Sequence, residues 1–71
     1  MNEVISFSGL EFMVETNIKP KNYKALVLNY LHHKAYMIEK LKGRHDTSDL
    51  ELEFVKAIRL AERLGIKWTP K

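Results

Sequence analysis

Residues 23–64 read YKALVLNYLHHKAYMIEKLKGRHDTSDLELEFVKAIRLAERL, and this stretch decides the fold. Mainly apolar side chains recur in it at alternating intervals of three and four, which aligns them along one stripe of an α-helix. The first stripe comprises Tyr23, Val27, Tyr30, Lys34, Met37 and Leu41. The second comprises Leu50, Phe54, Ala57, Ala61 and Leu64. The short polar connector between the stripes predicts two long helices folded back as an antiparallel hairpin.

Proline and glycine mark the ends of the first long helix. Pro20 is tolerated only in the first turn of a helix, so this helix should begin between Pro20 and Asn22. It should run to Lys42 and end at Gly43, because glycine readily adopts the left-handed backbone angles of a helix C-terminus.

The second long helix has its own start and stop signals. Thr47 or Ser48 is expected to cap it, and Ser48 stands at capping-box spacing from Glu51. Gly65 is expected to end it. Ala57 and Ala61 on its apolar stripe are small enough for another helix to approach closely.

Residues 1–18 fit two local structures. Their apolar residues suit an extended stretch over residues 3–7. Ser8 and Glu11 also have capping-box spacing, which predicts a short helix over residues 9–16. We favour the short helix, and in either form this apolar arm should pack on the hairpin or on another subunit.

A chain of 71 residues makes one domain, here an arm (residues 1–18) and a helical hairpin (residues 19–71). So short a chain buries only about 60% of its unfolded surface, and without cysteines it has no disulfide to compensate. Leu28, Leu52 and Val55 fall off the two apolar stripes and need cover from the N-terminal arm, the Trp68 tail or a second subunit. We therefore predict a homodimer in which two hairpins form a four-helix arrangement.

Several features of the sequence favour a cytoplasmic protein. No apolar run approaches the roughly 18 residues of a membrane span, so we expect no membrane partner. The N-terminus lacks the basic and apolar regions of a signal peptide. The absence of cysteine fits a reducing compartment.

The sequence offers no convincing catalytic, cofactor or metal site, and we expect no enzyme activity. Potential metal ligands cluster at His32, His33, His45, Asp46 and Asp49. Adjacent histidines point about 100° apart on a helix, so His32 and His33 cannot share a metal on one face. The three glycines are isolated and form no phosphate-binding loop. We interpret the cluster as solvent-facing histidines and a polar turn.

Positive charge is concentrated on two parts of the chain. Residues 19–45 carry seven bases and one acid, a net charge of +6, within a total of +3. One cluster comprises Lys19, Lys21 and Lys24. A second, the basic stripe, comprises Lys56, Arg59 and Arg63 at helical spacing. Both suit phosphate contacts, so nucleic-acid binding is the alternative function. The chain lacks glutamine for base readout, and its connector is long for a helix-turn-helix.

Protein binding is the function that we favour, as a small interaction or regulatory module. Tyr36, Leu52 and Trp68 are candidate anchors because we expect them to be exposed, and Trp and Tyr are among the residues that dominate binding hot spots. Trp68 has a second interpretation, in which it folds back to cover the hairpin. Lys34 either extends its amine to water from the apolar stripe or specifies the partner and the register.

Overall fold

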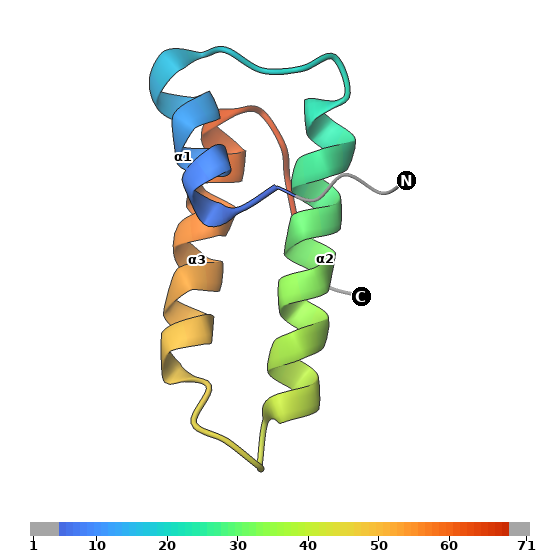
Figure 1. The fold of residues 1–71 in the computed structure, drawn as a ribbon, viewed down its shortest axis with the longest axis vertical. Coiled ribbons are helices and arrows are strands. Elements are labelled where there is room, and N and C mark those ends of the chain that lie inside the picture. The colour runs from blue at the N-terminus through green and yellow to red at the C-terminus, as the bar shows by residue number, and fades with distance from the viewer. Residues whose placement is uncertain (1–4, 69–71) are drawn as a thin grey trace.

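Three α-helices make up the described part of the chain (Figure 1). The structure is a computed structural model that describes residues 5–68. Helix α1 spans Phe7–Thr16, α2 spans Tyr23–Leu41 and α3 spans Ser48–Arg63, and these residues form no β-strand. The all-α prediction is confirmed. The predicted pattern of two long helices with a short helix or extended arm is replaced by three helices of 10, 19 and 16 residues.

Helix α1 is longer than predicted because Ser6, and not Ser8, caps it. The Ser6 hydroxyl oxygen accepts the backbone N–H of Gly9 at 3.1 Å, which satisfies one of the unpaired donors of the first turn. Asn17 ends the helix in the left-handed conformation, with φ of 58°. Residues 3–4 of the predicted extended stretch lie outside the described residues.

The start of α3 also differs from the prediction, because Asp46 organises it. The hydroxyl and the backbone N–H of Ser48 both donate to the Asp46 carboxylate, at 2.6 Å and 2.9 Å. These hydrogen bonds lower the pKa of Asp46 below its ordinary value. Thr47 stands at the N-cap position, and its hydroxyl donates to Glu51 at 3.2 Å. The predicted capping box between Ser48 and Glu51 is therefore wrong.

Both predicted glycine stops are confirmed. Gly43 follows the end of α2 with φ of 90°, and Gly65 follows the end of α3 with φ of 82°. Beyond Gly65, the backbone N–H of Ile66 reaches back to the carbonyl of Ala61 at 2.9 Å. This bond satisfies a carbonyl of the last turn and redirects the chain toward the other helices.

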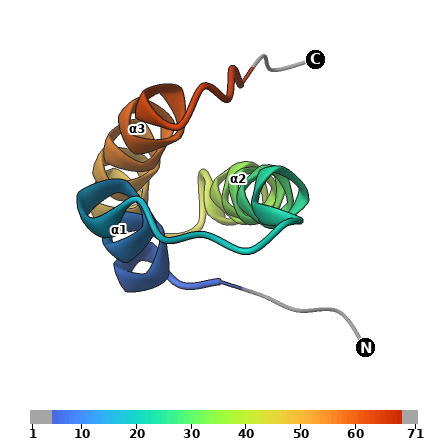
Figure 2. The ribbon, with the colours of Figure 1, turned by 90° about the horizontal axis from the view of Figure 1, so that it is seen from above.

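Helix α3 is the element on which the others pack. Both α1 and α2 make their main contacts with it, and Ala57 and Ala61 on α3 are fully buried. In Figure 1, α2 descends and α3 returns beside it. Viewed from above, α1 and the C-terminal segment lie on opposite sides of the α2–α3 pair (Figure 2). The core comprises Leu10, Met13, Val27, Tyr30, Leu31, Ala57, Ala61 and Ile66.

Candidate functional site

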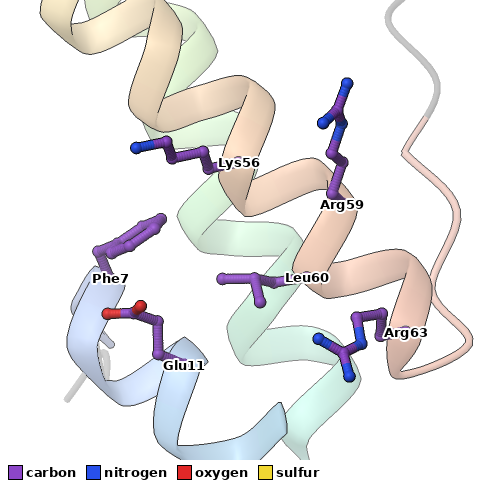
Figure 3. A pocket seen from close by; sticks show the side chains of 6 residues that line it. All are labelled: Phe7, Glu11, Lys56, Arg59, Leu60 and Arg63. Atoms are coloured by element: carbon purple, nitrogen blue, oxygen red, sulfur yellow. The ribbon is translucent and has the colours of Figure 1, made fainter. Parts of the chain in front are cut away.

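A groove between α1 and α3 is the first of two candidate binding surfaces (Figure 3). Its volume is about 430 Å³. Its lining residues are Phe7, Glu11, Lys56, Arg59, Leu60 and Arg63. Phe7 from α1 and Leu60 from α3 extend toward each other and form an apolar floor. Cationic side chains of α3 stand around that floor.

The predicted basic stripe supplies one wall of this α1–α3 groove. Lys56, Arg59 and Arg63 follow helical spacing, so α3 presents them on neighbouring positions. Phe7 and Glu11 lie four residues apart on α1, and the same rule places them together. The sequence does not indicate this contribution of α1, because the docking of α1 on α3 is a long-range contact that leaves no local signal.

The electrostatics of the α1–α3 groove are strongly unbalanced. Three cationic side chains line it, against the single carboxylate of Glu11. Among the described residues, no ion pair involves Lys56, Arg59 or Arg63. The groove therefore carries a net positive charge above an apolar floor, which favours a ligand with both acidic and apolar groups.

The other predicted basic cluster does not join this groove. This cluster, formed by Lys19, Lys21 and Lys24, is exposed around the start of α2. None of the three lysines lines the α1–α3 groove. The ammonium group of Lys19 donates to the Asn17 side-chain oxygen at 2.8 Å and stands 5.1 Å from the centre of the Tyr23 ring. The groove brings together only one of the two basic groups that the sequence indicated.

The second candidate surface is a hollow between α2 and α3, which we call the α2–α3 hollow. Its volume is about 370 Å³. It is lined by Ala35, Ile38, Glu39, Lys42, Glu51, Phe54 and Val55. Val55, on α3, is 46% exposed. The apolar residues of this lining, with the exposed side chain of Val55, form an uncovered apolar face.

The three predicted protein anchors have different surroundings. Tyr36 is 58% exposed, with Lys40 above its ring, and Leu52 is also exposed. Trp68 is half-buried and folds back on the helices, with its ring edge-on to His32 at 4.4 Å and to Phe54 at 6.0 Å between centroids. Trp68 therefore helps to close the space between α2 and α3, the second of its two predicted placements.

Lys34 forms a polar link between α2 and α3. Its ammonium group lies 2.8 Å from the Glu53 carboxylate, which also accepts the Tyr30 hydroxyl at 3.0 Å. The hydrogen bond from Lys34 lowers the pKa of Glu53, and the bond from Tyr30 acts in the same direction. Burial, followed by the hydrogen bond to Glu53, raises the pKa of Tyr30. These contacts hold the relative register of the two helices within one chain.

Within residues 5–68, no three histidine, aspartate or glutamate side chains gather closely enough to hold a metal ion. The helices of this part of the chain are also too short or too polar to cross a membrane. No protein-family model, no curated protein and no solved structure matches the chain. The α1–α3 groove and the α2–α3 hollow are therefore the features that indicate a function.

Proposed function

We propose that this chain is a small cytoplasmic interaction module that acts by binding other proteins and forms a homodimer, with no catalytic step. The observation that carries the proposal is the uncovered apolar face at the α2–α3 hollow. Val55 remains about half exposed there, beside the apolar residues Ala35, Ile38 and Phe54. An apolar face of this kind is typical of a protein contact surface.

A second copy of the chain suits this face. A twofold contact requires a surface that is complementary to itself, and here the exposed side chain of Val55 stands at a hollow. The rim carries both signs of charge, with Lys42 beside Glu39 and Glu51. In the proposed dimer, α2 and α3 of each copy form an antiparallel hairpin, and the two hairpins make a four-helix arrangement.

The exposed area indicates a weak dimer. Complete burial of an aliphatic side chain is worth about 1.5–3 kcal/mol, so covering the exposed half of Val55 is worth about 1 kcal/mol. Two copies contribute two such side chains, or about 2 kcal/mol. Association costs about 4–15 kcal/mol, so the lining of the hollow has to supply the remainder. We therefore expect the dimer to dissociate on dilution.

Sedimentation velocity over micromolar to millimolar concentrations tests the dimer. We expect the wild-type protein to shift from monomer to dimer as concentration rises, and Val55→Glu to remain a monomer. Ile18→Glu is the matched control, because Ile18 is 65% exposed and lies outside the α2–α3 hollow. A wild-type protein that remains monomeric throughout would refute the homodimer, and a Val55→Glu variant that dimerises normally would refute this face.

Nucleic-acid binding is the alternative function, supported by the presence of Lys56, Arg59 and Arg63 around one groove. Three phosphate contacts predict that the logarithm of the binding constant falls with the logarithm of salt concentration at a slope of about −2.7. A steeper slope of about −5.4 would indicate that the lysine cluster at residues 19–24 also takes part. Reversing the charges of Arg59 and Arg63 should abolish duplex binding under this alternative.

A further inference from the structure

The α1–α3 groove combines an apolar floor with a cationic rim, and this combination indicates its ligand. Phe7 and Leu60 are partly buried and pack against the core, so each presents only part of its apolar surface to the groove. Lys56 and Arg63 extend from α3 on either side of Leu60 (Figure 3). We propose that this groove binds an acidic amphipathic segment of a partner protein.

The floor favours a protein segment over a nucleic acid. An apolar centre within a polar rim is the usual anatomy of a protein–protein contact. Glu11 also lies in the groove, where it would repel a continuous row of phosphates. A protein segment avoids this repulsion, because its carboxylates are spaced and an apolar side chain can stand opposite Glu11.

The spacing of the cations defines the segment further. Lys56 and Arg63 are seven residues apart on α3, which corresponds to about 10.5 Å along the helix axis. A helical partner with acidic residues at positions i and i+7 has the same separation, two turns apart. An apolar residue at i+3 or i+4 then meets the floor formed by Phe7 and Leu60. This is helix-in-groove recognition with charge complementarity at both ends.

A labelled synthetic peptide tests the proposal by fluorescence anisotropy. The probe is a helical peptide with leucines along one face and glutamates flanking them at i and i+7. Its control has the same composition, shuffled so that leucines and glutamates no longer share a face. A duplex DNA is the third probe. We expect the wild-type protein to bind the first peptide more tightly than either of the other two.

Variants of the groove make the test specific. Arg63→Glu should weaken peptide binding about tenfold, because it replaces an attraction by a repulsion. Glu11→Gln should strengthen binding about twofold, since it removes the one carboxylate of the groove. Lys24→Glu is the matched control, with the same charge change at an exposed residue outside the groove, and should bind as the wild type does. Circular dichroism verifies that each variant is folded.

Each contrary result overturns the inference. Equal binding of the two peptides would show that the apolar floor is not used, and equal effects of Arg63→Glu and Lys24→Glu would show that the attraction is unspecific. Tighter binding of the duplex would assign the groove to nucleic acid. If the first peptide did not bind, the groove would not be a site for acidic amphipathic segments. Val55→Glu should bind the peptide normally, because Val55 lines the α2–α3 hollow and not the groove, so the homodimer proposal stands or fails separately.

Discussion

Replacement of Leu10 by alanine is the most direct test of how the three helices depend on one another. Leu10 lies on α1, is completely buried, and belongs to the same cluster as Leu31 of α2 and Ala61 of α3. If α2 and α3 formed a stable hairpin on their own, detachment of α1 would leave both of them folded. Because the core is shared by all three helices, we expect Leu10→Ala to weaken the whole fold.

The expected loss is large compared with the total stability. Removing a buried leucine side chain costs about 2–5 kcal/mol, since transfer free energy is lost and a cavity remains. A chain of 71 residues has a total stability of about 3.5–11 kcal/mol at about 0.05–0.15 kcal/mol per residue. A loss of about 3 kcal/mol lowers the Tm of a domain this size by about 12–24 °C.

Urea unfolding followed by two probes measures this effect. Circular dichroism reports on all helices, and Trp68, the single tryptophan, reports on the contact with His32 and Phe54. We expect both transitions of Leu10→Ala to shift together to lower urea. Phe12→Ala is the control on the same helix, because Phe12 is 53% exposed and should cost less than about 1 kcal/mol. A loss below about 1 kcal/mol in Leu10→Ala, or a shift in only one probe, would contradict the shared core.

Three further predictions concern single local interactions. The pKa of Glu53 is depressed in the folded state, so its contribution to stability is present above the ordinary value of 4.5 and is lost as pH falls through the folded value. Because Glu53 is 38% exposed, this contribution stays below about 1 kcal/mol. Urea unfolding from pH 6 to pH 3 should therefore show a slightly larger loss of stability in the wild type than in Glu53→Gln. Gly65→Ala should cost about 1 kcal/mol through the backbone alone, since φ is 82° and nothing lies within 4 Å of an added Cβ; an unchanged Tm would contradict this strain. Ser6→Ala should cost about 1 kcal/mol by removing the cap of α1, and Ser8→Ala on the same turn should cost clearly less; equal losses would argue against Ser6 as the cap.

The helices and several of their ends follow from local patterns in the sequence. The spacing of three and four residues predicts α2 and α3, because side chains at these intervals share one face of a helix whatever the rest of the chain does. Gly43 and Gly65 follow the ends of their helices because the chain there takes positive φ angles, which glycine adopts without strain. This preference depends on the local backbone alone, so the sequence predicts it. The caps were less predictable, because Ser6 and Ser8 both stand near the start of α1, and Thr47 and Ser48 both stand near the start of α3. Only the geometry of each turn decides which residue caps the helix.

The sequence by itself determined the all-α class, two of the helices and the cationic wall formed by Lys56, Arg59 and Arg63, because each of these depends on residues close together along one helix. Only the tertiary structure decided that α1 docks on α3 and so completes the groove with Phe7 and Glu11. It also decided that Trp68 folds back and that Lys34 pairs with Glu53. These contacts join residues distant in the chain, and their stability comes from apolar burial shared among all three helices, which no local pattern records.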